Sequence, residues 1–341
     1  MTAPEQRADP LAEMLINRVR KNRRRLAPWL AREGVTCYRL YDRDIPEIPL
    51  VVDWYEGRLH ASSYARDGVG ETGEARHERL ARAMAVLAAA LGVPAADVHV
   101  KRRVRAPGGT QYGRLARTGK RFTVAEGDLA FWVNLEDYAD TGLFLDHRRL
   151  RALVRAEAAD RRFLNLFAYT GAFSVHAAAG GARETVSVDL SNTYLAWARD
   201  NLALGGFFEP DHRTVRDDVL GFLEGSRRRG EGGFDLVVID PPTISRSKKM
   251  ACDLDVQRDH PRLIEGALAL CRPGAVVYFS TNFSGFELRL ASAAGLAVED
   301  ITRRTTPADF RTVPHRCFRI TAGSPLSDRK PTPLAAFADR R

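Results

Sequence analysis

Hydrophobic positions in the first third of the chain follow two different periods. Apolar side chains recur at helical spacing over residues 11–33 and again over 72–91, and a glycine follows each of these segments. Between them, residues 37–41 predict a strand and residues 50–64 predict a β-hairpin. Further short strands are expected over 98–104, 122–126 and 130–135. These elements predict a small α+β module.

The pattern changes in the second part of the chain, where short apolar runs alternate with helical segments. Strands are expected over residues 163–168, 185–188, 212–215, 234–239 and 275–280, and helices over 172–179, 194–204, 219–228 and 256–270. Such alternation predicts an α/β fold with a doubly wound, Rossmann-like, largely parallel sheet. We therefore divide the chain into an N-terminal module (1–137), a nucleotide-binding domain (138–323) and a polar C-terminal tail (324–341).

One strand–turn–helix–strand unit, Phe163–Leu190, indicates what the second domain binds. Its turn holds Gly171, and Asp189 ends its second strand, where the carboxylate of a nucleotide-binding fold meets a ribose. The turn lacks the G-x-G-x-x-G pattern that a pyrophosphate requires. S-adenosylmethionine (SAM) has a ribose and no phosphate, so the unit favours SAM over NAD. A purely structural unit is the alternative.

Two more acidic turns are expected at the same edge of the sheet. Asp240-Pro241-Pro242 follows an apolar strand, and its two prolines give a stiff turn with free carbonyl groups that can hold a purine edge. Asp218, in the turn before residues 219–228, can accept a hydrogen bond from an adenine amino group. The alternatives are a plain turn for the first and an ordinary helix cap for the second.

Composition narrows the class of protein. The 341 residues are 45% hydrophobic and 28% charged, with no apolar run of membrane-helix length and no secretory signal at the N-terminus. Four scattered cysteines indicate reduced thiols and neither a disulfide framework nor a metal site. We therefore expect a cytoplasmic protein that uses no membrane and no metal.

A net charge of +9 suggests a polyanionic partner, and basic residues are clustered. The candidates for RNA contact are Arg18, Lys21, Arg23, Arg24 and Arg25 on the first predicted helix, Lys101, Arg102 and Arg103 after a strand, and Lys248 and Lys249 after the Asp-Pro-Pro turn. These clusters predict that residues 1–137 form an RNA-binding module. A solvated basic face is the alternative.

Several segments also carry a family resemblance. They are NRVRKN, CYRLYD, TGLFLDHR, FLNLFAYTG, GGAR, VDLSNTYLAWARDNL, IDPPT, VQRDH and FSTN. From about Leu15 to Ala322 the chain resembles the guanine-N7 methyltransferase half of the bifunctional 23S ribosomal RNA large-subunit methyltransferase. The resemblance implies a class I SAM-dependent fold, and methyl transfer to N7 of a guanosine in 23S rRNA or a large-subunit precursor.

The resemblance also implies roles for individual residues. Asn165, Phe167, Tyr169, Thr170 and Gly171 would line the methionine side of SAM; Asp189, with Leu190 and Ser191, would bind the ribose; Asp218 would bind the adenine; Asp146 and Arg148 would close over the cofactor; and Asp240, Pro241, Pro242 and Thr243 would position the base or the cofactor amine. Because N7 of guanine has a free lone pair, its methylation needs alignment and no general base. Consistently, the single histidines His147, His176 and His260 are interpreted as structural or RNA-contacting.

Two departures leave alternatives open. The family's second methyltransferase half is not in this sequence, and Ile244 stands where an aromatic residue was expected to stack on the base, so Phe283 or Tyr112 is the candidate instead. Cytosine-C5 methylation would require a cysteine nucleophile. Thr281-Asn282 occupies its expected place, although Cys252 and Cys271 lie elsewhere. Exocyclic-amino methylation and a non-catalytic SAM- or RNA-binding assembly factor also remain, and the oligomeric state is open.

Overall fold

Seven strands form the main sheet of the structure, a computed structural model that describes residues 9–67, 71–103, 115–245, 253–290 and 295–322. Their spatial order is β14, β15, β13, β10, β7, β8, β9. The bounds are β7 Arg162–Leu166, β8 Glu184–Asp189, β9 His212–Arg216, β10 Phe234–Ile239, β13 Cys271–Thr281, β14 Leu296–Asp300 and β15 Arg316–Ala322. Strands β13, β10, β7, β8 and β9 pair in parallel, whereas β15 is antiparallel to both of its neighbours. The expected doubly wound, largely parallel sheet is confirmed.

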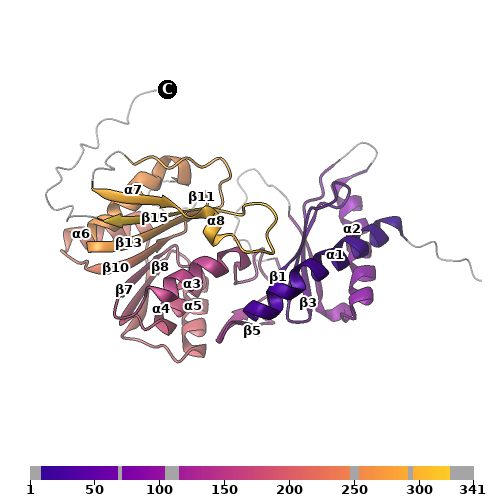
Figure 1. Ribbon diagram of the computed structural model, residues 1–341, viewed down its shortest axis with the longest axis horizontal. Helices are drawn as coiled ribbons and strands as arrows, with labels where there is room; N and C mark the ends of the chain where they lie inside the picture. The colour runs from indigo at the N-terminus through magenta and orange to yellow at the C-terminus, as the bar shows by residue number, and fades with distance from the viewer. Residues whose placement is uncertain (1–8, 68–70, 104–114, 246–252, 291–294, 323–341) are drawn as a thin grey trace, which may run out of the picture.

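Helices cover both faces of this sheet. The helices after the parallel strands are α4 Ala172–Ala179, α5 Asn192–Leu204, α6 Val219–Arg228 and α7 Val256–Ala269, and α3 Arg148–Ala156 precedes β7. Figure 1 shows α3, α4 and α5 together on one side of the sheet. The short elements are the 3₁₀ helices Ala95–Asp97 and Leu145–His147, α8 Thr302–Thr305, and the two-residue strands β11 Ile244–Ser245 and β12 Leu254–Asp255.

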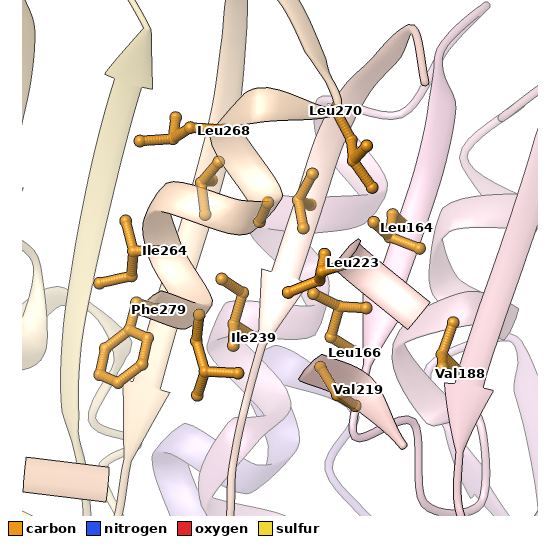
Figure 2. Packing of buried hydrophobic residues seen from close by; sticks show 14 of the residues in the cluster. Leu164, Leu166, Val188, Val219, Leu223, Ile239, Ile264, Leu268, Leu270 and Phe279 are labelled. Atoms are coloured by element: carbon orange, nitrogen blue, oxygen red, sulfur yellow. The ribbon is translucent and has the colours of Figure 1, made fainter. Parts of the chain in front are cut away.

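Strand β10 shows why the sequence FDLVVI forms a central strand. Successive side chains point to opposite faces, so Leu236 and Val238 pack with α3 and α4 while Val237 and Ile239 pack with α6 and α7. Figure 2 shows the second of these layers, in which Ile239 lies near Leu223 of α6 and Ile264 of α7. All four side chains are fully buried. An unbroken apolar run is therefore required where both faces are covered.

The N-terminal module is a second layered unit beside the main sheet (Figure 1). Strands β1 Cys37–Asp42, β2 Leu50–Tyr55, β3 Arg58–Ser63 and β4 Val98–Arg102 form a sheet in that order, and helices α1 Pro10–Glu33 and α2 Gly73–Leu91 share a hydrophobic cluster with it. Asp9 caps the start of α1, and Gly34 ends it in the left-handed conformation.

A hairpin, β5 Phe122–Glu126 and β6 Leu129–Val133, connects the two units. Its Phe131 lies in one buried cluster with Tyr55 of β2, Val175 of α4 and Leu202 of α5. The domain boundary at residue 137 remains a prediction, because this hairpin packs against both the N-terminal module and the helices of the second domain.

No helix in the described part of the chain is long and apolar enough to cross a membrane.

Candidate active site

A cavity of about 500 Å³ opens at the carboxyl ends of β7, β8 and β10. Ligands of open α/β sheets bind at this edge, where the strand order reverses. Residues from five segments line it: Asp140, Gly142, Phe144, Asp146 and His147 before α3; Phe167, Ala168, Tyr169 and Thr170 after β7; Asp189, Leu190 and Ser191 at the end of β8 and just after it; Asp217 and Asp218 before α6; and Asp240, Pro241 and Pro242 after β10. Most of the residues predicted from the sequence to bind the cofactor therefore share one cavity.

The turn after β7 is held in an unusual conformation by Asp189. Phe167 and Tyr169 have positive φ angles of 59° and 50°, which non-glycine residues rarely adopt. The carboxylate of Asp189 accepts hydrogen bonds from the backbone N–H of Tyr169 (2.9 Å) and of Ser191 (2.8 Å). Burial raises the pKa of Asp189, although these backbone bonds oppose the shift. Strain held in this way is typical of ligand sites.

Gly171 is required by the close approach of α5. Its φ is 73°, and a Cβ built on it would lie 2.8 Å from Cβ of Ala198. Thr170, fully buried, donates from Oγ1 to the carbonyl of Gly142 (2.6 Å) and accepts at its own carbonyl from Asn201 (2.8 Å). Gly171 thus shapes the turn without lining the cavity.

Two further residues predicted to bind the cofactor, Asn165 and Arg148, also lie outside the cavity lining. Asn165 is buried on β7 and donates to Oγ of Ser174 (3.0 Å), beneath the cavity and outside its lining. Arg148 also lies outside the lining, because its guanidinium bonds the carbonyl of Cys37 in the N-terminal module and the carboxylate of Asp309 after α8. The structure therefore places Arg148 outside the cavity lining, and its closure over the cofactor stays a prediction. The Arg148 side chain takes this direction because both the buried carboxylate of Asp309 and the carbonyl of Cys37 bond its guanidinium.

The acidic turn before α6 includes the helix cap that was one alternative for Asp218. Its Oδ2 accepts from the backbone N–H of Gly221 (3.1 Å), and the residue also lines the cavity. Asp217, the neighbouring acid of the same turn, is exposed and lines the cavity, so it is a second candidate for the adenine.

The Asp-Pro-Pro turn faces the same cavity. Asp240, Pro241 and Pro242 line it, whereas Thr243 lies just outside and donates from Oγ1 to Asn282 (2.6 Å), which does line it. Thr243 thus reaches the site through Asn282 at the end of β13.

A histidine that the sequence did not single out as functional lies next to this turn. His147 lines the cavity, and its Nε2 is 2.9 Å from Oδ2 of Asp240. Burial on its own lowers the pKa of His147, but the charges of Asp240 and Asp146 outweigh burial and raise it to about 9. Asp146 also accepts from His315 (3.1 Å). The adjacency of Asp146 and His147 was visible in the sequence; their proximity to Asp240 was not.

The aromatic candidates for base stacking also change. Phe283 packs against the hydrophobic core and is absent from the cavity lining, and Tyr112 lies outside the described residues. Phe144 lines the cavity, is 41% exposed, and lies 5.0 Å from the ring of Tyr169, centroid to centroid. It is the exposed aromatic side chain of the lining that sequence reasoning missed.

The basic clusters separate into two kinds. On α1, Arg20, Lys21, Arg23, Arg24 and Arg25 are exposed and Arg18 is half-buried. The second cluster, at the end of β4, is less exposed: Lys101 is buried and donates to the carbonyl of Tyr138.

Burial, followed by the charge of Arg103, lowers the pKa of Lys101 to about 8. Arg103 is paired with Asp140 (2.8 Å), and Arg102 is half-buried. Lys101 is therefore buried and bonded within the protein, and its contact with RNA stays a prediction. Lys248 and Lys249 lie outside the described residues.

No nucleophilic thiol is found among the described cysteines. Burial raises the pKa of Cys37 and of Cys271 to about 12, and also raises that of Cys317. Such thiols stay protonated at neutral pH, and only the thiolate is nucleophilic. Cys252 lies outside the described residues.

The strand order and the cavity at its reversal define a Rossmann-like fold with a ligand site at the switch point of the sheet. The crystal structure of SMU.776 complexed with SAH has this fold, with a TM-score of 0.73 and 22% identity over 93% of this chain and 83% of that one. The SAM-dependent methyltransferase from Agrobacterium tumefaciens aligns with a TM-score of 0.55 and 19% identity over 80% of this chain and 87% of its own.

Sequence comparison identifies the family. The model of the S-adenosylmethionine-dependent methyltransferase family matches residues 41–294, and the chain belongs to this family. Proteins named ribosomal RNA large subunit methyltransferase K/L are 51% identical over 311 residues in Chromohalobacter salexigens and 47% identical over 318 residues in Methylococcus capsulatus. Each match covers 91% of this chain and 42% of the relative, so the chain spans less than half of their length.

The family's cofactor is SAM, and the cavity suits it chemically. An acid at the end of β8, a turn after β7 without a phosphate-binding glycine pattern, and acids before α6 provide acceptors for hydroxyl and amino groups. These are the groups of an adenosine without phosphate.

Proposed function

We propose that the chain transfers a methyl group from SAM to N7 of a guanosine in 23S rRNA. The observation that carries this proposal is the cavity that brings Asp189 and Asp240 together, on a chain about half identical to proteins named ribosomal RNA large subunit methyltransferase K/L. Membership of the SAM-dependent family supports the reaction class. The base and the RNA remain part of the proposal.

In this proposal each group of cavity residues binds one part of SAM. Asp189 accepts from the ribose hydroxyls, Asp217 and Asp218 face the adenine, and the turn of Phe167 and Tyr169 holds the methionine part. SAM supplies an electrophilic methyl on a sulfonium sulfur. The chain's task is to hold a base nitrogen in line with that methyl, since an aligned lone pair needs no proton acceptor.

The Asp-Pro-Pro turn would hold the base edge. Prolines 241 and 242 have no N–H to donate and a fixed φ, so the turn offers acceptors in a stiff arrangement. The guanine amino and N1–H groups are donors that such acceptors can bind. Phe144, half-exposed at the cavity, provides a face on which the base can stack.

Affinity for RNA would come from helix α1. Its exposed arginines and lysine form a basic surface, and Arg23 lies over the ring of Trp54 at 5.6 Å, which fixes one guanidinium. Contacts between cations and phosphates release counterions, so binding weakens steeply with salt. Neutralising Arg23, Arg24 and Arg25 should flatten the slope of log affinity against log salt; an unchanged slope would remove this helix from the RNA interface.

The substrate is tested by nucleoside mass spectrometry of rRNA from cells with and without the gene. Loss of 7-methylguanosine supports the proposal. Loss of 5-methylcytidine or of an exocyclic N-methyl nucleoside would replace the acceptor atom, and an unchanged profile with intact SAM binding would favour a non-catalytic factor.

The role of Asp240 has its own test. Asp240→Ala should leave SAM binding largely intact and abolish methyl transfer, because the residue is proposed to hold the base. A matched control is Asp235→Ala at the opposite end of β10, where the carboxylate accepts from the backbone N–H of Arg162 (2.9 Å), far from the cavity lining. Full activity of Asp240→Ala would make the turn purely structural.

A further inference from the structure

Few backbone hydrogen bonds hold Asp240 in place. It follows β10 directly, and its N–H reaches the carbonyl of Leu166 only at 3.5 Å. The next two residues are prolines, so the turn has no further backbone donor to bind the carboxylate. A carboxylate that must hold a base in line with a methyl group therefore needs support from elsewhere in the fold.

His147 supplies that support. Its Nε2 lies 2.9 Å from Oδ2 of Asp240, across 93 residues of sequence. The ring is buried between Phe173 of α4 (5.6 Å between ring centroids) and His315 (4.6 Å). Its backbone sits at the junction of the 3₁₀ helix Leu145–His147 and α3, so the main chain is fixed as well as the ring.

His147 is in turn surrounded by further polar side chains. Nδ1 of His315 lies 3.1 Å from Oδ2 of Asp146, and the other nitrogen of the same ring lies 3.0 Å from Oγ1 of Thr305. His315 is buried, and Asp146 lies 3.9 Å from Nδ1 of His147, too far for a hydrogen bond but near enough to favour its positive charge. The charged and titratable groups that face His147 are thus Asp240, Asp146, Arg151 and His315.

We propose that His147, backed by Asp146 and His315, is a positioning residue that orients the carboxylate of Asp240 for methyl transfer. This inference rests on the proposed function of the Asp240 turn and adds a residue to it. His147 takes no proton from the base in this scheme. It donates one hydrogen bond from Nε2 and keeps the carboxylate in a single orientation, which matters because an error of about 1 Å in placing a reactant can slow a reaction about 100-fold.

The first experiment compares three variants in single-turnover methyl transfer to 23S rRNA. His147→Ala should lower the rate constant about 100-fold while the Kd for SAM and the half-saturating RNA concentration change less than about threefold, because the proposed hydrogen bonds to SAM and to the base come from other residues. His147→Gln, whose side-chain amide can donate to Asp240, should recover at least about tenfold of that loss. His176→Gln is the matched control: it replaces another buried histidine, one 3.0 Å from Glu126 and absent from the cavity lining, and should leave the rate unchanged.

The double variant tests the contact through folding stability, because Asp240→Ala leaves no methyl transfer to measure. If His147 bonds Asp240, His147→Ala should lower the free energy of unfolding less in an Asp240→Ala background than in the wild type. Additive losses, or a Kd for SAM that rises as much as the rate falls, would overturn the proposal. Recovery of activity by Zn²⁺ after dialysis against a chelator would also overturn it, since Asp146, His147 and His315 offer ligand atoms within 4.8 Å of one another.

A measurement without substrate keeps the contact testable if rRNA is the wrong acceptor. In protein labelled with ¹⁵N-histidine, Nε2–H of His147 should give a protected proton resonance that disappears in Asp240→Ala. A missing resonance, or one that is unchanged in the variant, refutes the contact. A normal resonance with no transfer to rRNA would refute the proposed substrate alone.

Discussion

Replacing Asp189 tests the centre of the candidate site. Its carboxylate lines the cavity at the end of β8 and holds the backbone of Tyr169 and Ser191 through bonds of 2.9 and 2.8 Å. Asp189→Ala would remove the proposed ribose acceptor and release a turn in which Tyr169 has a φ of 50°. We expect SAM to bind much more weakly, because both the acceptor and the shape of the methionine pocket are lost.

The magnitude follows from the bonds involved. Hydrogen bonds to a charged group contribute about 1.5–3 kcal/mol each, and a ribose offers two hydroxyls. Loss of even one such bond, at about 1.4 kcal/mol per tenfold change in affinity, predicts at least a tenfold rise in Kd, and loss of both predicts about 100-fold or more. Because burial already raises the pKa of Asp189, the folded protein gains little from its charge, and stability should change less than affinity.

Titration calorimetry with SAM measures the affinity, and urea unfolding measures stability. The matched control is Glu184→Ala at the opposite end of β8, where the carboxylate pairs with Arg162 (2.6 Å) and not with the cavity. The control should keep the wild-type Kd. An unchanged Kd in Asp189→Ala, or an equal loss in the control, would refute the reasoning.

Three further predictions concern stability. Gly171→Ala should destabilise the protein by about 3 kcal/mol, since a left-handed non-glycine residue costs about 1–2 kcal/mol and crowding against Ala198 at 2.8 Å adds about 1–3; a urea midpoint equal to that of the wild type would contradict this. Glu126→Gln should cost about 3 kcal/mol, because Glu126 bonds two nitrogens of the fully buried Arg151 at 2.6 Å each and its loss leaves that charge uncompensated; urea unfolding at neutral pH would show it. The pKa of His147 is raised to about 9, above the ordinary histidine value near 6.5, so its protonation stabilises the fold fully below pH 6.5 and this stabilisation is lost as the pH rises through 9. The free energy of unfolding of the wild type should therefore fall by about 3 kcal/mol relative to His147→Gln between pH 6 and 10. Parallel curves of stability against pH for the two proteins would exclude a charged His147.

Most elements of the fold were accessible from the sequence because their signals are local. The helix Ala172–Ala179, the helix Val219–Arg228 and the strands Phe122–Glu126 and Phe234–Ile239 have the predicted bounds. Strand β13 begins at Cys271, four residues before the predicted start, because residues 271–274 continue as exposed or half-buried strand before the buried apolar run. The closing strands β14 and β15 were not predicted individually, since their pairing order depends on β13.

The candidate site divides in the same way. Asp189, Asp218 and Asp240 follow strands, and the carboxyl ends of parallel strands meet at one edge, so their convergence could be predicted. The places of Arg148 and Lys101 could not. The sequence does not distinguish a basic residue that faces a ligand from one that pairs within the protein. Only the folded chain shows that Asp309 lies beside Arg148 and that the carbonyl of Tyr138 lies beside Lys101.

The sequence by itself determined the layers, the fold class and the acids that surround the cofactor, because hydrophobic period and turn chemistry act over a few residues. The tertiary structure alone decided which polar groups bond across the fold: His147 with Asp240, His315 with Asp146, and Arg148 with Asp309, which are 93, 169 and 161 residues apart in the chain. Such pairs leave no periodic trace, since a buried hydrogen bond depends on the direction and distance of two side chains that only packing brings together. The chain's sequence therefore indicates where the chemistry lies, and its folding determines which residues hold it in place.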